Sequence, residues 1–277
     1  MAAALDLDAI AASLHRVHTL TRHDEIPSLT TLRPGTHGRP AAFLDLALTD
    51  ETAAALKEAT RRRRGTPVPS NEAGQYGVCD VGEKRVGVAV GRRGWLAEPW
   101  TGDLWLSEQA ACGCRVHLAD FPAGLAIAGG VVAEIFQCDG DVETWLCVWA
   151  PALECSHATP LAFGAAPLEA VARSGLHAGV VCGTDWSPVT TLAKVPSTMP
   201  IIVEVDEQIV CEVPADDLGG IVGAVARLHA AEPLAAGVRV LVAPAAVAAP
   251  VSCTSDVRAE LNGKEVHCRV LGDGDPY

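Results

Sequence analysis

A turn signal near the C-terminus constrains the fold of this chain most strongly. In DVRAELNGKEVHCRV, two strand-like stretches flank Asn262-Gly263, a pair that accepts the positive φ angles of a type I′ turn. The segment MPIIVEVDEQIVCEV predicts two more strands, joined at the polar residues Asp206 to Gln208. The pattern does not alternate strands with long helices, and no glycine-rich phosphate loop follows a strand. We therefore predict an α+β protein, with a mixed β-rich fold and flanking helices, rather than a doubly wound sheet.

The middle of the chain adds further elements of both kinds. VVAEIFQ, GVVCG and VRVLV read as strands, and DDLGGIVGAVARLHAAEPL reads as an amphipathic helix. DVETWLCVW predicts a short helix with Asp141 as its N-cap. Trp145 and Trp149 fall on the apolar face of that helix, so we expect both to be core residues.

Residues 1–65 are predicted to form a mainly helical N-terminal portion. Apolar residues recur there at helical spacing, namely Leu7, Ile10, Leu14 and Val17. DETAAALKEATRRRR predicts a second helix, and Arg61 to Arg64 are expected to be its solvated end, where cations complement the helix dipole. Residues 66–277 form the β-rich core, and we expect the two parts to make one structural unit.

Charge and composition narrow the partners and the compartment. The formal net charge of −13 would repel a polyanion, so nucleic acid is not an expected partner. The N-terminus lacks the pattern of a signal peptide, and no apolar run is long enough to span a bilayer, so we expect a cytoplasmic protein with no membrane partner. The ten cysteines are scattered and are expected to be reduced thiols. Cys112 and Cys114 lack the second ligand pair of a structural zinc site.

The order of motifs from residue 120 to residue 270 resembles a known family. VVAEIF, APALE, AGVVCG, the LGG...AVARL helix, AGVRVLVAPAAVAAPV and DVRAEL follow one another with the spacing of the 2-oxopent-4-enoate hydratase and 4-oxalocrotonate decarboxylase family. That family lies within the fumarylacetoacetate hydrolase superfamily. The resemblance implies a β-rich fumarylacetoacetate-hydrolase-like fold, and the departures described next indicate a diverged member.

The resemblance also implies a metal site, which this chain keeps only in part. In the family, three carboxylates hold Mg²⁺ or Mn²⁺, two from a Glu-x-Glu strand and one from a Pro-Ala-Leu-Glu segment. Aligned on VVAEIF, the first carboxylate becomes Val132, whereas Glu134 and Glu154 remain. Because a carboxylate and its charge are lost, we expect either weakly bound Mg²⁺ or Mn²⁺ or no required cofactor.

Other pocket positions depart from the family as well. CSHAT places His157 and Thr159 where the family has Asp and Arg, and SGLHAGVVCG places His177 at the pocket edge. The two hydroxyls of the family's Gly-Ser-Leu-Thr segment are lost in Ala243-Pro244-Ala245-Ala246. The family's lysine segment aligns either with TPVPSNEAGQYGV or with Lys84–Gly87, and both alignments stay open.

These residues define a candidate site. A carboxylate on an apolar strand needs a partner or a metal, which favours a pocket position for Glu134 and for Glu154, although solvent at an edge strand is the simpler alternative. His157 and His177 would join them if the fold holds, because imidazole beside carboxylate suits acid/base catalysis near neutral pH. We therefore predict four catalytic residues, Glu134, Glu154, His157 and His177. Surface or structural roles are favoured for three further residues, His117, Asp185 and Lys194.

Two functions fit this reading. The first is an enzyme of the lyase, isomerase or cyclase type that acts on an enolisable oxo compound, a small-molecule substrate of specialised-metabolite biosynthesis. The second is a non-catalytic relative that stabilises or partners an active homologue. Members of the family are commonly homo-oligomers, so we expect a homo-oligomer in either case.

Overall fold

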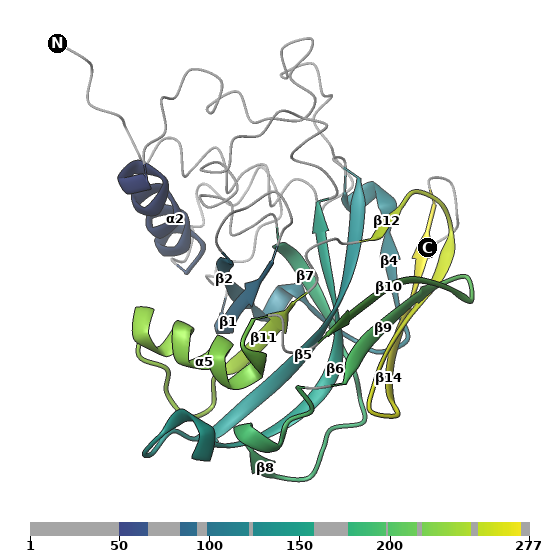
Figure 1. The fold of residues 1–277 in the computed structure, drawn as a ribbon. Coiled ribbons are helices and arrows are strands. Elements are labelled where there is room, and N and C mark those ends of the chain that lie inside the picture. The colour runs from purple at the N-terminus through teal and green to yellow at the C-terminus, as the bar shows by residue number, and fades with distance from the viewer. Residues whose placement is uncertain are drawn as a thin grey trace, which may run out of the picture.

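The computed structural model describes residues 50–65, 84–92, 99–121, 124–157, 177–197, 199–214, 218–244 and 249–272. Two β-sheets form the body of this part, and two α-helices lie to one side of the first sheet (Figure 1). The first sheet contains β1 (Arg85–Gly91), β2 (Trp100–Trp105), β3 (Gln109–Ala111), β5 (Leu125–Gln137), β6 (Leu146–His157), β7 (His177–Cys182), β8 (Thr190–Thr191), β11 (Arg239–Ala243) and β12 (Ala249–Val251). The second contains β4 (Cys114–His117), β9 (Pro200–Val205), β10 (Gln208–Pro214), β13 (Ser255–Leu261) and β14 (Lys264–Leu271). The helices are α2 (Asp50–Gly65), α5 (Gly220–Ala231) and the short 3₁₀ helices η3 (Leu106–Glu108), η4 (Leu118–Asp120), η5 (Val142–Thr144) and η7 (Leu192–Lys194).

Both predicted hairpins are confirmed. β9 and β10 are joined at Asp206 and Glu207, and β13 and β14 at Asn262 and Gly263, and all four residues have positive φ angles between 49° and 73°. The strands predicted in VVAEIFQ, GVVCG and VRVLV are found as parts of β5, β7 and β11, to within one residue. The helices predicted in DETAAALKEATRRRR and DDLGGIVGAVARLHAAEPL are found as α2 and as the shorter α5. The helix predicted from Leu7 to Val17 lies outside the described residues. Among those that are described, no helix is long and apolar enough to cross a membrane.

The helix predicted in DVETWLCVW is wrong. Only Val142 to Thr144 form a 3₁₀ turn, and β6 begins at Leu146. Trp145, Cys147 and Trp149 alternate along the chain and are buried in one core, which is the period of a strand. The burial predicted for both tryptophans is confirmed, since they are 1% and 4% exposed.

The first sheet is rolled. Its strand order is β2-β1-β11-β5-β6-β7-β3, so β2 and β7 are five strand spacings apart, about 24 Å in a flat sheet. Yet Trp100 of β2 stacks on His177 of β7 with ring centroids 5.7 Å apart, and Arg239 of β11 donates to Gln109 of β3 at 2.5 Å. The two ends of the strand order therefore approach each other, and one face of the sheet becomes the inside of the roll.

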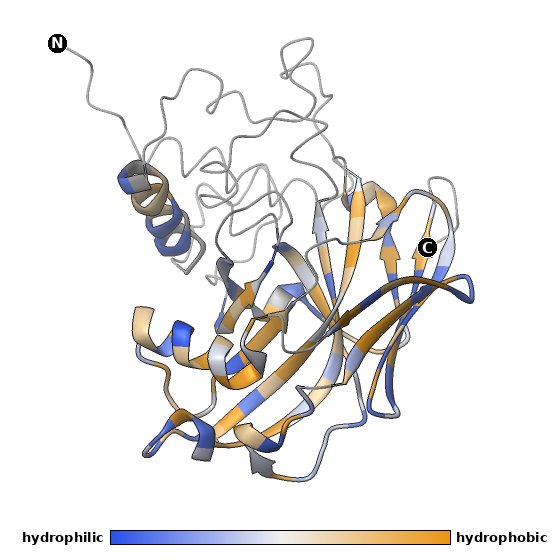
Figure 2. Ribbon diagram, in the orientation of Figure 1, coloured by the Kyte–Doolittle hydropathy of each residue, from blue (hydrophilic) through white to orange (hydrophobic). Residues whose placement is uncertain are grey.

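Alternation along the strands gives the sheet two apolar faces. The outer face packs against the second sheet and α5, and β5, which crosses the middle of the molecule, is apolar over most of its length (Figure 2). The two sheets approach each other closely at Gly129 of β5, because a Cβ there would lie 2.4 Å from Cγ2 of Ile201. The inside of the roll is lined by small and apolar side chains, namely Ala89, Trp100, Leu104, Val132, Ala150, Ala152, Val180, Cys182, Leu241 and Ala243.

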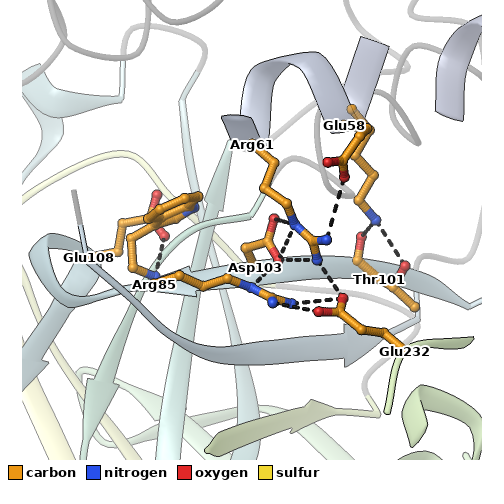
Figure 3. A network of polar contacts seen from close by, with 9 residues as sticks. Glu58, Arg61, Arg85, Thr101, Asp103, Glu108 and Glu232 are labelled. Carbon is orange, nitrogen blue, oxygen red and sulfur yellow. Dashed lines mark hydrogen bonds and ion pairs between the residues drawn. The ribbon is translucent and has the colours of Figure 1, made fainter. Parts of the chain in front are cut away.

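Helix α2 is fixed to the first sheet by a cluster of four ions, Arg61, Arg85, Asp103 and Glu232, in which each arginine contacts both carboxylates (Figure 3). Arg61 Nη2 lies 2.8 Å from Asp103 and 2.6 Å from Glu232. The solvated role expected for Arg61 is therefore wrong, because this side chain binds β2 and the end of α5. Beside the cluster, Lys57 donates to the hydroxyl of Thr101 at 2.9 Å, and burial lowers the pKa of Lys57.

The cluster predicts a loss of stability in acid. Hydrogen bonds from Arg85, and after it from Arg61, lower the pKa of Glu232 from 4.5 to about 2. A carboxylate with a depressed pKa in the folded state stabilises the fold above its unfolded pKa, and this contribution is lost as the pH falls towards 2. Glu232→Gln should therefore lower the free energy of unfolding at pH 6 by about 1 kcal/mol, a value limited by solvent screening. In urea titrations the difference from the wild type should shrink between pH 4.5 and pH 2.

Glu207→Gln is the matched control, because Glu207 lies exposed in the β9–β10 turn. Glu207→Gln should leave the free energy of unfolding nearly unchanged from pH 6 to pH 2. A Glu232→Gln difference that stays constant down to pH 2 would contradict the role given to the ion pairs.

Candidate functional site

Glu154 and His177 are brought together on neighbouring strands inside the roll. Glu154 lies in β6 opposite Val180 of β7, and both point to the same face of the sheet. Regular alternation would turn His177 to the other face, but the register shifts between Cys155 and Ser156, so His177 stands opposite Ser156. This irregularity re-aims the imidazole towards Glu154.

The pair is deeply buried and closely spaced. His177 Nδ1 lies 3.2 Å from Glu154 Oε1, and the two side chains are 1% and 0% exposed. Because an ionised carboxylate only accepts hydrogen bonds, the arrangement that satisfies an ionised Glu154 has the proton on Nδ1, and Nδ1–H donates to Oε1. Trp100 lies against the imidazole with an interplanar angle of 20°, which limits its movement.

The second nitrogen of the ring is left available for chemistry. Nε2 of His177 is buried and has no hydrogen-bond partner among the described residues. A buried polar atom without a partner is costly, so this nitrogen calls for an explanation, and a ligand that pairs with it would supply one. With Nδ1 protonated and held by a carboxylate, Nε2 carries the lone pair, which is the arrangement of a histidine that accepts a proton.

Glu134 does not join this pair. It lies opposite Val148 of β6, whereas Glu154 lies opposite Ala128, so six residues of β5 separate the two levels, or about 20 Å along the strand. Its carboxylate accepts a hydrogen bond from Arg239 Nε at 2.9 Å. The partner expected for this strand carboxylate is thus an arginine, whose guanidinium also lies 5.8 Å from the centre of the Trp186 ring.

The strand register also tests the metal motif. Oxygen ligands of one Mg²⁺ lie only about 3 Å apart, so Glu134 and Glu154 cannot hold the same ion, and the prediction of a shared site is wrong. The β5 residues beside Glu154 are Ala128, opposite it, and Ala126, opposite Ser156. A Glu-x-Glu pair that met Glu154 would occupy these two positions, and both are alanine. Val132 is a buried apolar residue of the roll.

The donor set therefore does not fit the family's metal. Where Glu154 of β6 pairs with β5, it is the one carboxylate of these two strands. The side chain next to it is the imidazole of His177. In the part of the chain that the structure describes, no group of three or more His, Cys, Asp or Glu side chains is placed to hold a metal ion.

The other predicted residues are placed as follows. His157 ends β6 with its backbone opposite Leu125, and its side chain lies outside the described residues, as do Thr159, Ala245 and Ala246. His117 ends β4 in the second sheet, and Lys194 lies in η7. Asp185 is exposed and pairs with Lys264 at 2.8 Å, so its surface role is confirmed.

Two features of the site were not predicted. Trp100 comes from a segment with no readable pattern, and its contact with His177 depends on the rolling of the sheet. Ala126 and Ala128 carry no chemical signal of their own. The sequence does contain one usable signal, since AIAGGVVA is a long apolar run before Glu134 and allows β5 to extend towards the N-terminus far enough to pair with Glu154.

Comparisons with known proteins identify the fold. No protein-family model matches the chain, and no curated protein matches it. Among solved structures, it is similar to 4-oxalocrotonate decarboxylase from Pseudomonas putida G7, complexed with magnesium and adipate, with a TM-score of 0.68 and 18% identity over 96% of this chain and 97% of that one. It is also similar to fumarylpyruvate hydrolase from Pseudomonas aeruginosa, in complex with Mn²⁺ and pyruvate, with a TM-score of 0.53 and 16% identity over 68% and 90% of the two chains.

Proposed function

We propose, from the premise that this chain has the fold of the fumarylacetoacetate hydrolase superfamily, that it is an enzyme of the lyase, isomerase or cyclase type acting on an enolisable oxo compound. The observation that carries the proposal is the buried Glu154–His177 pair with Nε2 of His177 left available. The similar structures named above are a decarboxylase and a hydrolase, which supports an active site in this fold.

In the proposed reaction His177 moves a proton. Nε2 removes a proton from the carbon next to a carbonyl group, and the electron pair of the C–H bond passes to the carbonyl oxygen, giving an enolate. The imidazolium formed is stabilised by Glu154, which also fixes the orientation of the ring. Return of the proton at another carbon gives an isomer. Loss of a leaving group from the β-carbon, which takes up the proton from the imidazolium, gives a lyase product. Attack of the enolate carbon on a second carbonyl carbon of the same molecule, whose oxygen takes up that proton, gives a cyclic product. These steps use only side chains of this chain.

The surroundings favour a substrate of low polarity. The wall of the roll near the pair includes Ala152 and Val180, both buried. β11 ends at Ala243-Pro244, where the resembled family has a segment with two hydroxyls. Because the positions aligned with those hydroxyls carry none, we propose a larger and less polar small molecule than a dicarboxylate.

Proton exchange tests the proposal before the substrate is known. Wild-type protein in D₂O should catalyse deuterium incorporation next to the carbonyl of at least one probe among 2-oxopentanoate, acetylacetone and a phenyl-substituted 1,3-diketone, followed by ¹H NMR. His177→Gln should slow this exchange about 10²- to 10⁴-fold, because general-base catalysis contributes that much. Glu154→Gln should slow it less, because the base remains.

His117→Gln is the control, since it replaces a histidine in the second sheet. It should exchange the probes at the wild-type rate, and circular dichroism should show that all three variants are folded. Exchange that is unchanged in His177→Gln, or absent in the wild type for every probe, would contradict the proposal.

A further inference from the structure

A second reactive centre lies where the two sheets are joined. Cys112 and Gly113 form the turn between β3 of the first sheet and β4 of the second. The turn is held on both sides, because the backbone N–H of Cys112 donates to the carbonyl of Cys182 at 2.9 Å and that of Gly113 donates to the carbonyl of His267 at 2.8 Å. Gly113 has a φ of 83°, which a residue with a side chain rarely adopts.

The sulfur of Cys112 contacts two groups of one residue. Sγ lies 3.3 Å from Nδ1 of His267, and the backbone N–H of His267 donates to the same sulfur at 3.3 Å. Cys112 is half-buried and His267 is exposed, so a reagent in solution can reach the pair. The imidazole nitrogen is placed to accept the thiol proton as the sulfur attacks, and the N–H points at the sulfur, so this geometry suits general-base activation of a nucleophilic thiol.

Other thiols of the chain lie in surroundings that disfavour the thiolate. Burial raises the pKa of Cys147 and of Cys182 to about 11, and that of Cys268 to about 12. Burial also raises the pKa of Cys114, two residues from Cys112. Cys253 is exposed, and its sulfur lies 3.7 Å from the hydroxyl of Ser255. It therefore serves as a reference thiol that is more accessible than Cys112 and lacks this imidazole contact.

We propose that Cys112 is a site of covalent modification, where His267 activates the thiol towards disulfides of low molecular weight. His267 accepts the proton of Cys112, and the thiolate attacks one sulfur of a disulfide R–S–S–R. The S–S bond of the reagent breaks, a new S–S bond forms between Cys112 and one R–S group, and the other leaves as R–S⁻, which takes up the proton. Cys112 is oxidised and the reagent is reduced, with no further reactant. The pair is separate from Glu154 and His177, so this inference does not depend on the proposed reaction.

The test uses oxidised glutathione as the probe and the reduced full chain. Samples are quenched with acid at intervals, and peptide mapping by mass spectrometry gives the rate of mixed-disulfide formation at each cysteine. Cys112 should react at least about tenfold faster than Cys253 in the same sample, because general-base assistance by His267 is available to Cys112 and not to Cys253. Treatment with dithiothreitol should remove the adduct.

Two variants distinguish activation of the Cys112 thiol by His267 from simple solvent access to that thiol. His267→Ala should slow the reaction of Cys112 about tenfold and leave that of Cys253 unchanged, and circular dichroism should show that the variant is folded. Cys114→Ser should leave the rate at Cys112 unchanged. Equal rates at Cys112 and Cys253 in the wild type overturn the proposal without recourse to a variant, and so does a rate at Cys112 that His267→Ala does not alter.

Discussion

Asp103→Ala should lower the free energy of unfolding by about 3 kcal/mol, at the lower end of the range for breaking a buried ion pair. The side chain of Asp103 is 6% exposed and contacts both Arg61 and Arg85. Its removal leaves two guanidinium groups and nearby Lys57 with Glu232 as their remaining partner in the cluster. The loss of free energy should lie at the lower end of this range because both arginine side chains are 29% exposed and can be partly hydrated. Urea unfolding at pH 7 measures the change.

Asp256→Ala is the matched control. Asp256 is 73% exposed and lies 3.8 Å from Arg269, so its loss should cost less than about 0.5 kcal/mol. Asp103→Asn, which keeps the shape but not the charge, should be intermediate. A change below about 1 kcal/mol for Asp103→Ala would show that the four-ion cluster does not stabilise the attachment of α2.

The double change Ala126→Glu and Ala128→Glu should create a site for a divalent metal ion. It places a Glu-x-Glu pair on β5 beside Glu154, the arrangement that the strand register specifies. Without metal, three neighbouring carboxylates at buried positions should destabilise the fold by several kcal/mol. Mn²⁺ should restore stability by about 2.7 kcal/mol at a concentration one hundred times its Kd, read as a rise in melting temperature. The wild type should show no comparable rise.

The design includes a test of the two glutamates. Adding Glu154→Gln to the double variant should abolish its response to Mn²⁺, and adding Glu134→Gln should leave the response unchanged. If the double variant does not fold alone, refolding in the presence of Mn²⁺ gives the same comparison. Strong stabilisation of the wild type by Mn²⁺ that Glu134→Gln abolishes would contradict the assignment and favour Glu134 as a ligand.

The parts of the fold that depend on local chemistry could be predicted. The turn at Asn262-Gly263 requires positive φ angles that this pair tolerates, and α5 has apolar residues at helical spacing, so each is specified within a few residues. The sequence of DVETWLCVW predicts a helix because Val142, Trp145, Leu146 and Trp149 also have the spacing of one helical face. The alternation of Trp145, Cys147 and Trp149 was the decisive signal, since β6 extends on to His157.

The candidate site was predictable only in part, because it depends on register between distant segments. Glu154 and His177 were both identified as chemical groups, and their contact depends on a register shift that no local pattern reveals. The placement of Glu134 failed for a related reason. VVAEIF matches the letters of a metal motif, but pairing with β6 places Ala128, six residues earlier, opposite Glu154. A sequence motif therefore identifies a metal site only when strand pairing places its carboxylates beside the other metal ligands.

The four-ion cluster also constrains the order of folding. Arg61 and Glu232 are separated by 171 residues, and Arg85 and Glu232 by 147. During synthesis α2 leaves the ribosome long before its second acidic partner exists, and closing so large a loop carries a high entropic cost. Contacts of long sequence separation form slowly. We therefore expect α2 to dock last, after β1, β2 and α5 have assembled. The docking of α2 would then be the final step of folding.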